Sequence, residues 1–568
     1  MIRYLILILS LSFFSSCAQQ SMQDYAGNWE GTLPNIDAFN FSITLKNLTS
    51  NSYKITIANT KTLFNEKLKS TSNDHIKISL DDYIHFNLHF KNDENELTGF
   101  VNAGRLMYKI NLRKTEANTY TGTWNPLMIN SSLQSDSILL SVYKNEGRTL
   151  AAYPFFGDQR FSGFWADDFI ELDNMVSFRC LKTGLKFRSI LSKDEIQLEI
   201  LLGDIFVTKT NLKRLETDWK PIITSIEQNQ NTNKPRQLND GWTTTNLNEV
   251  DINQTKLEQL IKKIIHTKEY ENTHSILIAK RDKLVFETYF DGYNHNIPHD
   301  LRSASKSISS AVIGIAIDDK IIENVDQKLY EFVPKAYQYT KNPLKSKITI
   351  KDLLTMSSGL DVNKMAEEGN YQESNNWLKT VLEAPIVKAP GTYADYGSAN
   401  PFLLGVILNE RLDKPLELYM DEKLFAPLGI RNYINQTEGT ETTPYFGGGM
   451  HLTSRDMLKF GQLYLNKGIW KEKRIISENW VDESFKKHTR LQDQKEKNEY
   501  GYLWWHYTYI IDGKVIKSIE ARGAGGQYIF VIPELESVIV ITSGNYRNGK
   551  TRQPEKILED YILPAIIN

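Results

Sequence analysis

One predicted helix, over residues 304–317, constrains the fold of this chain more than any other segment. Its apolar residues recur at helical spacing and include Ala304, Ile308, Val312 and Ile315. The apolar face is broad, so we expect the helix to be buried among other elements. The chain has 568 residues, 40% of them apolar, which is enough for the core that such a helix needs and for two or more domains.

A serine and a lysine stand at the start of this helix. Ser303 and Lys306 are three residues apart, a spacing that places two helical side chains on one face about one turn apart. A desolvated lysine can lose its proton near neutral pH and then accept the proton of a serine hydroxyl. The first turn of a helix also favours developing negative charge. The spacing therefore predicts Ser303 as an acyl-transfer nucleophile and Lys306 as its general base.

The Ser-x-x-Lys pattern is weak when taken alone, because serine and lysine are common in this chain. Two further copies occur, Ser141 to Lys144 and Ser484 to Lys487. The buried helix that follows Ser303 distinguishes the copy at Ser303 from the other two.

Charge and metal-binding residues exclude several classes of protein. The 67 basic and 69 acidic residues give a formal net charge of -2 without a basic stripe, which argues against nucleic-acid binding. Cys17 and Cys180 are the only cysteines, too few for a disulfide framework or a cysteine metal site. The ten histidines include no His-Glu-x-x-His pattern. We therefore expect no metal and no organic cofactor.

Residues 1–17 are typical of a secretory signal. Arg3 is followed by an apolar run over residues 4–14, too short to span a bilayer stably. Small residues followed directly by Cys17 resemble a bacterial lipoprotein cleavage site, which would make Cys17 the lipidated first residue of the mature protein. The alternative is a plain signal peptide with an incidental cysteine. In either case we expect the mature protein to be extracytoplasmic: a lipid-anchored bacterial envelope protein, which contacts the membrane only through that anchor, or otherwise a periplasmic protein.

The remainder divides into two predicted domains. Residues 22–217 show short alternating runs punctuated by Asn, Asp, Gly and Ser, which predicts an all-β barrel or sandwich. Residues 218–253 include a polar stretch, Gln228 to Pro235, and form the predicted linker. Residues 254–568 mix helical and strand patterns around Ser303. Substrate capture and a spacing role both remain open for the β-rich domain.

Two later loops carry groups that could serve the same chemistry. Tyr396 stands just before a predicted helix, where its phenol could exchange protons with Lys306 and a leaving group. The alternative is a structural tyrosine, and the chain has 28 tyrosines. Gly523 and Ala524 precede a strand predicted over residues 528–532, where N–H groups could face an oxyanion. The alternative there is a bulge or close strand packing.

Taken together, these segments resemble the β-lactamase-like serine hydrolases over roughly residues 240–568. This superfamily includes class C β-lactamases, D-alanyl-D-alanine carboxypeptidases, family VIII esterases and nylon-oligomer hydrolases. The matching segments are Ser303 to Lys306, Leu353 to Leu360, Tyr396 to Ser398, Gly447 to Met450, Ser454 to Asp456, Tyr500 to Trp505 and Gly523 to Gln527.

The resemblance implies a fold and a set of roles. The fold is α+β, with an antiparallel five-stranded sheet flanked by helices and a helical subdomain. Ser303 becomes the acylated nucleophile, Lys306 its base and Tyr396 a proton relay. The third position of the tyrosine motif is Ser398. The backbone N–H groups of Ser303 and Ala524, with Ala524 just after Gly523, would form the oxyanion hole.

One motif departs from the family pattern. Where β-lactamases and penicillin-binding enzymes carry Lys-Thr-Gly, this chain has Ala521-Arg522-Gly523. Arg522 is basic and a candidate for substrate binding, but it stands one position away from the lysine of that motif. The sequence around it is more similar to that of the esterase and amide-hydrolase branch. We expect a serine hydrolase acting on an ester or amide in a small molecule or peptide. A D,D-carboxypeptidase or β-lactamase, and a non-catalytic binding or sensor protein, are the alternatives.

Overall fold

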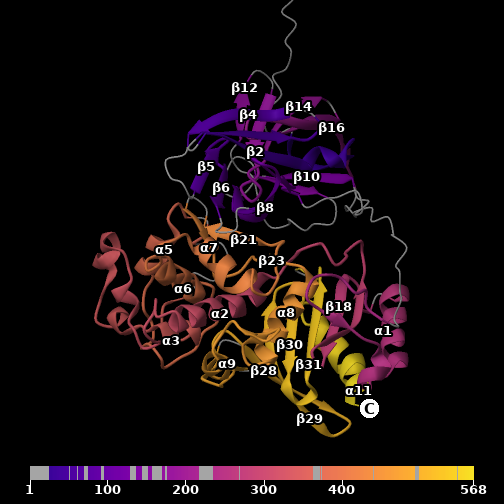
Figure 1. Cartoon of the computed structure of the whole chain (residues 1–568), viewed down its shortest axis with the longest axis vertical. Coiled ribbons are helices and arrows are strands. Elements are labelled where there is room, and N and C mark those ends of the chain that lie inside the picture. Colours follow the sequence, from indigo (N-terminus) through magenta and orange to yellow (C-terminus); the bar gives the residue numbers. More distant parts are fainter. Residues whose placement is uncertain are drawn as a thin grey trace, which may run out of the picture.

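The computed structural model describes most of the chain from Tyr25 onward (Figure 1). The described residues are 25–49, 52–60, 62–69, 75–90, 95–127, 136–143, 151–156, 169–172, 175–192, 194–216, 234–267, 269–361, 371–372, 374–438, 441–492, 498–546 and 548–567. Cys17 lies outside them, so lipidation stays a prediction. No helix within these ranges is long and apolar enough to cross a membrane.

The C-terminal half is built on one sheet, to which the described residues contribute nine strands. Its order is β17-β19-β18-β31-β30-β29-β28-β27-β26, antiparallel except between β17 and β19. The five strands predicted are too few. β17, β26 and β27 have two residues each, too short to show a readable alternation. The bounds are β17 Thr243–Thr244, β18 Thr273–Lys280, β19 Lys283–Tyr289, β26 Thr489–Arg490, β27 Glu499–Tyr500, β28 Trp505–Ile511, β29 Lys514–Gly523, β30 Gln527–Ile532 and β31 Ser537–Ser543.

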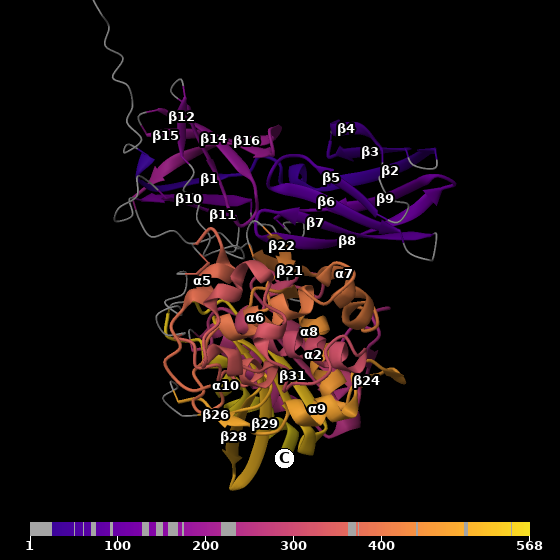
Figure 2. The same ribbon diagram turned by 90° about the vertical axis from the view of Figure 1, so that its left-hand side faces the viewer.

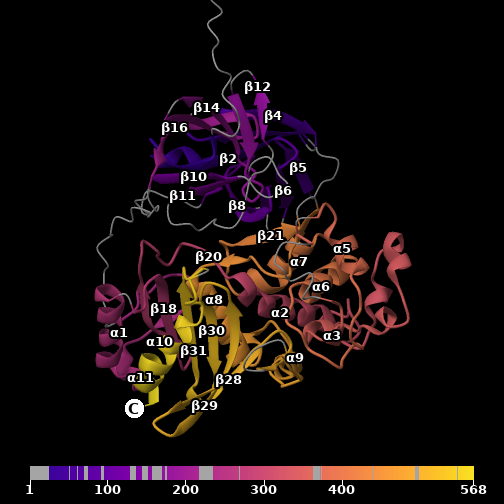
Figure 3. The same ribbon diagram turned by 180° about the vertical axis from the view of Figure 1, so that it is seen from behind.

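Helices cover both faces of this sheet (Figure 3). On one face lie α1 (Gln254–His266), α10 (Gln553–Ile557) and α11 (Leu563–Ile567), whose apolar residues share a core with Phe530, Ile539 and Ile541. On the other face lie α8 (Ser454–Leu465) and then α2 (Ser305–Asp318). The mixed α and β architecture agrees with the predicted α+β class.

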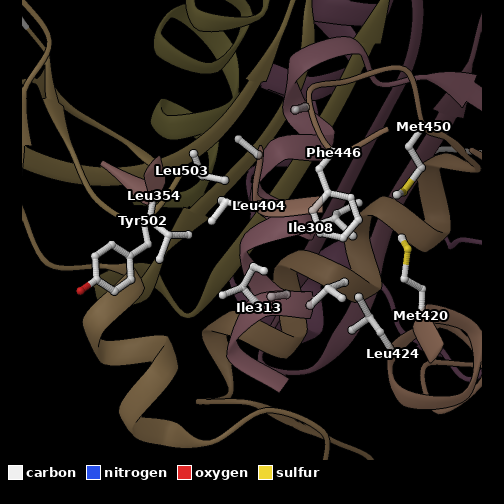
Figure 4. Packing of buried hydrophobic residues seen from close by; sticks show 14 of the residues in the cluster. Ile308, Ile313, Leu354, Leu404, Met420, Leu424, Phe446, Met450, Tyr502 and Leu503 are labelled. Atoms are coloured by element: carbon white, nitrogen blue, oxygen red, sulfur yellow. The ribbon is translucent and has the colours of Figure 1, made fainter. Parts of the chain in front are cut away.

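The helix α2 runs through the middle of a helical subdomain. Every residue from Ser305 to Ala316 is buried, as the broad apolar face predicted. Figure 4 shows Ile308 and Ile313 of α2 among Leu404, Leu424 and Phe446 from surrounding segments. Within the described residues, the subdomain also contains the helices α3 (Ile350–Leu354), α5 (Trp377–Glu383), α6 (Ala399–Asn409), α7 (Leu416–Met420) and α9 (Glu478–Ser484).

The N-terminal half is all β, as predicted. Two sheets make up this half (Figure 2). One has the order β11-β10-β1-β16-β15-β14-β13-β12, and the other contains β4-β3-β2-β9-β8-β7-β6-β5. The two sheets share an apolar core. The bounds are β1 Gly27–Thr32, β2 Phe41–Thr49, β3 Ser52–Ala58, β4 Thr62–Lys69, β5 His75–Ser79, β6 Ile84–Phe90, β7 Glu96–Ala103, β8 Leu106–Glu116, β9 Thr119–Trp124, β10 Ser137–Tyr143, β11 Ala151–Phe156, β12 Ile170–Leu172, β13 Met175–Arg179, β14 Lys186–Ser192, β15 Glu195–Leu202 and β16 Ile205–Leu215.

The two halves share a sheet, which the sequence did not predict. β8 pairs with β21 (Ile434–Glu438) of the C-terminal half, with Tyr108 opposite Ile434. β21 is followed by β23 (His451–Leu452) and then by β20 (His299–Asp300). Phe100 and Met107 of the N-terminal half belong to the core of the C-terminal half.

The predicted linker over residues 218–253 extends too far toward the C-terminus. Trp242 is buried in the core beside α8 and donates its indole N–H to the Arg455 carbonyl. Asp240 accepts a hydrogen bond from the Arg455 guanidinium at 2.8 Å. Residues 234–253 therefore belong to the packed C-terminal half, because buried aromatic and ion-pair contacts outweigh the polar sequence around them.

Candidate active site

Ser303 and Lys306 meet at the start of α2. Ser303 lies in η5 (Arg302–Ala304), a single turn of 3-10 helix that leads into α2. The Lys306 Nζ group donates a hydrogen bond to Ser303 Oγ at 2.8 Å and another to the Gly447 carbonyl at 2.5 Å. Lys306 is 1% exposed. The hydroxyl–amine contact on which the nucleophile assignment depends is therefore present.

The residue before the nucleophile has an unusual backbone. Arg302 has a φ of 49°, in the left-handed region that residues other than glycine rarely adopt. Asp300 supports it twice: one carboxylate oxygen accepts the Arg302 backbone N–H at 2.9 Å, and the other lies 3.2 Å from Arg302 Nε. Backbone outliers of this kind cluster at functional sites. The sharp entry into η5 thus depends on a carboxylate three residues before Ser303.

Tyr396 lies on the same side of α2 as Lys306. Lys306 Nζ is 5.3 Å from the centroid of the Tyr396 ring. The ring also contacts Trp505 at 5.1 Å and Tyr500 at 6.3 Å between centroids. The fold therefore brings Ser303, Lys306 and Tyr396 together, although Tyr396 stands 93 residues after Ser303 in the sequence.

Ser398 belongs to a hydroxyl cluster that sequence reasoning missed. Its side chain hydrogen-bonds to Tyr445, which also contacts the hydroxyl of Tyr371 and the amide of Gln372. A Cβ on Gly447 would lie 2.1 Å from the Tyr445 hydroxyl oxygen, so this cluster sits against the residue whose carbonyl holds Lys306. The signal in the sequence was only that Tyr445 lies two residues before the Gly447 to Met450 motif.

Gly523 lies against the nucleophile turn. It ends β29, and a Cβ there would lie 2.1 Å from the Leu301 carbonyl oxygen and 3.2 Å from the Ala304 nitrogen. Only a residue without a side chain allows this approach. Ala524 follows at an exposed position. The contact is compatible with an oxyanion hole formed by Ser303 and Ala524, whose roles stay predictions.

Arg522 is held by two carboxylates. Its Nε donates to Glu520 at 2.7 Å, and its Nη1 is 3.5 Å from Glu555. Its guanidinium also lies 5.2 Å from the ring centroid of Trp505. Burial alone would lower the pKa of Arg522, but the charges of Glu520 and Glu555 raise it above its usual range. The positive charge of Arg522 is thus already balanced, and substrate binding by Arg522 stays a prediction.

A separate cavity of about 140 Å³ lies beside the loop that carries Tyr396. Neither Ser303 nor Lys306 lines it, so the reactive centre is located by the hydroxyl–amine contact and not by this cavity. Its lining includes Met356, Asp361, Lys388, Tyr393, Asp395 and Asn400. In the described part of the chain no three His, Cys, Asp or Glu side chains are grouped to hold a metal ion.

Comparison with known protein families finds a match in the C-terminal half of the chain. The family model described as Beta-lactamase matches residues 267–560. The 6-aminohexanoate-dimer hydrolase of Paenarthrobacter ureafaciens is 24% identical over 295 residues, which cover 47% of this chain and 71% of that protein. A relative from Mycobacterium tuberculosis is 25% identical over 203 residues, 29% of this chain and 50% of the relative.

The chain is also similar to solved structures, at lower identity. A D-stereospecific amidohydrolase from Streptomyces sp. is 14% identical, with a TM-score of 0.42 over 54% of this chain and 98% of that chain. A penicillin binding protein from Bacillus halodurans is 15% identical, with a TM-score of 0.41 over 52% of this chain and 97% of that chain.

Proposed function

Since the chain belongs to the beta-lactamase family, we propose that it is a serine hydrolase that forms an acyl-enzyme on an ester or amide. The observation that carries the proposal is the 2.8 Å contact between Lys306 Nζ and Ser303 Oγ. Burial of Lys306 supports it, because a desolvated amine loses its proton more readily than an exposed one.

The proposed reaction begins with Lys306 as a neutral amine. Its Nζ accepts the proton of Ser303 Oγ, and Oγ attacks the substrate carbonyl carbon. The oxyanion receives hydrogen bonds from the backbone N–H groups of Ser303 and Ala524. Tyr396 passes a proton to the leaving group, whose bond to the acyl carbon breaks, and takes in its place the proton that Lys306 received from Ser303. Water then attacks the acyl carbon and gives a proton to Lys306 through Tyr396. The bond between the acyl carbon and Ser303 Oγ breaks, Oγ takes the proton back from Lys306, and the acid product leaves.

The pairing of Arg522 bears on the choice between substrate classes. A carboxypeptidase or β-lactamase needs a cation that is available for a substrate carboxylate, and the charge of Arg522 is balanced by Glu520 and Glu555. This favours esters or amides without a carboxylate next to the scissile bond. The relative named for hydrolysis of a 6-aminohexanoate dimer makes a linear amide the first substrate to test.

A fluorophosphonate probe tests the proposal directly. Intact mass should show one adduct on the parent protein and none on Ser303→Ala. Ser307→Ala is the matched control, because Ser307 lies in the first turn of the adjoining helix α2 and its hydroxyl donates to the Leu503 carbonyl. The nucleophile assignment is wrong if Ser303→Ala labels like the parent. Absence of any adduct on the parent would favour the binding-protein alternative.

A substrate panel then separates the remaining classes. Short-chain aryl esters, the 6-aminohexanoate dimer, nitrocefin and a D-Ala-D-Ala peptide should be compared at equal enzyme concentration. We expect turnover of the first two and none of the others. Turnover of nitrocefin or of the peptide would instead favour the β-lactamase or carboxypeptidase alternative.

We also propose that the mature protein is extracytoplasmic and anchored through a lipid on Cys17. The apolar run before Cys17 supports this. In bacterial cells, radiolabelled palmitate should be incorporated into the parent chain and not into Cys17→Ala. Equal labelling of both proteins would rule out the anchor at this residue.

A further inference from the structure

The buried carboxylate of Asp300 contacts Arg302, the residue directly before Ser303. Asp300 is 6% exposed and is the second residue of β20. It accepts the Arg302 backbone N–H and pairs with the Arg302 guanidinium. Because Arg302 adopts the left-handed conformation directly before Ser303, the orientation of Asp300 helps to set the direction in which the chain enters η5.

The N-terminal half supplies a cation to this carboxylate. Lys182 Nζ lies 3.9 Å from Asp300 Oδ2, and the two side chains are 1% and 5% exposed. His451 Nε2 is also 3.9 Å from the same oxygen. Burial alone would raise the pKa of Asp300, but the charges of Arg302 and Lys182, together with the Arg302 backbone N–H, hold it below its usual range. Asp300 therefore stays ionised between groups from both halves of the molecule.

Backbone contacts fix the position of Lys182. It lies in the turn between β13 and β14, and its carbonyl accepts the Arg105 N–H at 3.0 Å. The Arg105 carbonyl in turn accepts the Thr437 N–H at 2.8 Å, next to the β8–β21 pairing. At Gly104, a Cβ would lie 2.4 Å from the Leu181 carbonyl oxygen. The turn that carries Lys182 is thus packed tightly against the turn between β7 and β8, at the start of the strand that joins the two halves.

We propose that Lys182 is a positioning residue for Ser303, so that the N-terminal β half completes the active site of the C-terminal half. The inference rests on the proposed hydrolase function. Lys182 pairs with Asp300. It acts through Asp300, whose two oxygens hold the Arg302 backbone and guanidinium, and hence through the left-handed turn that presents Ser303 to Lys306.

The chain offers a matched control for this proposal. Lys109 also belongs to the N-terminal half, and its Nζ lies 3.8 Å from Asp421 of the C-terminal half, with both side chains 2% exposed. Asp421 accepts a hydrogen bond from Tyr433. Removing either lysine breaks one buried ion pair across the same interface, but only Lys182 pairs with the carboxylate that holds Arg302.

The experiment compares Lys182→Met and Lys109→Met in the full chain. Active sites are titrated with a fluorophosphonate, and kcat and KM are then measured per active site on an aryl ester. We expect Lys182→Met to lower kcat by about 10-fold or more with KM within about 2-fold, because small misplacements of a reacting group cost rate. Lys109→Met should leave both constants within about 2-fold of the parent. Lys182→Gln, measured in the same way, replaces Lys182→Met if that variant does not fold.

Three outcomes would overturn the inference. Parent rates in the folded Lys182 variant would show that the ion pair does not position Ser303. Equal losses in the Lys182 and Lys109 variants would assign the effect to the interface as a whole. In both cases the proposed function stands, because the parent reacts. A parent without adduct or turnover would remove the proposed function itself, and this inference with it.

Discussion

Lys306 Nζ donates hydrogen bonds to two acceptors, Ser303 Oγ and the Gly447 carbonyl oxygen. The second bond fixes the amine, so its position does not depend on the serine. When Lys306 is neutral it can keep donating to Gly447 while its lone pair accepts the serine proton. This division of roles at a single nitrogen suits a general base that must keep its place through the reaction.

Lys306→Met should lower kcat/KM for aryl esters by about 10²- to 10⁴-fold, the usual contribution of a general base. Lys306→Arg should not restore activity, because a guanidinium does not lose its proton in proteins. Lys345→Met is the control, since Lys345 is also buried and its ammonium donates to the Leu382 carbonyl. Steady-state kinetics per titrated active site provide the measurement. Activity in Lys306→Arg close to that of the parent would exclude Lys306 as the base.

His451 should make the fold sensitive to mild acid. Burial lowers the pKa of His451 to about 4, against about 6.5 for an unfolded histidine. Between these values the unfolded chain binds the extra proton, so stability is full above about pH 6.5 and falls as pH drops toward about 4. The loss between about pH 7 and about pH 5 is about 2 kcal/mol of unfolding free energy.

Urea unfolding at the two pH values measures this loss. The same pair of measurements on His451→Gln isolates the histidine, since the variant should show a smaller difference between the two pH values. An unchanged difference in the variant would assign the acid sensitivity to other groups, such as His506, whose pKa burial also lowers to about 4.

At the scale of elements, the end of β29 packs directly on η5, and Gly523 provides the space. Gly523→Ala places a methyl group against the Leu301 carbonyl. We expect a loss of about 1–3 kcal/mol of stability, as for other overpacked sites, and a lower rate of acylation. Gly513→Ala, at the open turn between β28 and β29, has no atom within 4 Å of the new Cβ, although its φ of 79° strains an alanine there. It should cost about 1–2 kcal/mol of stability through that strain and leave the acylation rate unchanged.

Thermal unfolding and fluorophosphonate labelling rates test this pair of glycines. Parent behaviour in Gly523→Ala would mean that β29 moves away easily, and the strand end would then not support an oxyanion hole. A loss of acylation in Gly513→Ala would mean that distant backbone changes alone affect the site.

How far elements could be predicted depends on the range of the interactions that make them. Ser303 and Lys306 face each other because helical spacing is local, and the predicted burial of the helix that follows them depends on the same local spacing. The resemblance supplied Tyr396, which no local rule connects to Lys306. The β8–β21 pairing joins residues more than 300 positions apart, and strand alternation does not name a distant partner. Lys182 likewise had no local signal, since its partner Asp300 lies in the other half.

For the whole molecule, the β8–β21 pairing, the shared cores and two buried ion pairs should hold the halves together without a covalent link. A protease site inserted within residues 217–233 tests this. After cleavage, we expect the two fragments to elute together on size exclusion and to keep the hydrolase activity of the parent. In the Lys109→Met variant, the cleaved fragments should associate more weakly, since one of these two buried ion pairs is then lost. Separation of the parent fragments under native conditions would contradict the expectation.

The strand β21 has a consequence for recombination with related proteins. In a chimaera that replaces the N-terminal half with an unrelated module, the edge of β21 that pairs with β8 would expose unpaired backbone N–H and C=O groups. Such an edge can pair with other chains and promote aggregation. Useful crossover points in such experiments therefore retain β8 together with the hydrolase half, even though more than 300 residues separate them in the gene product.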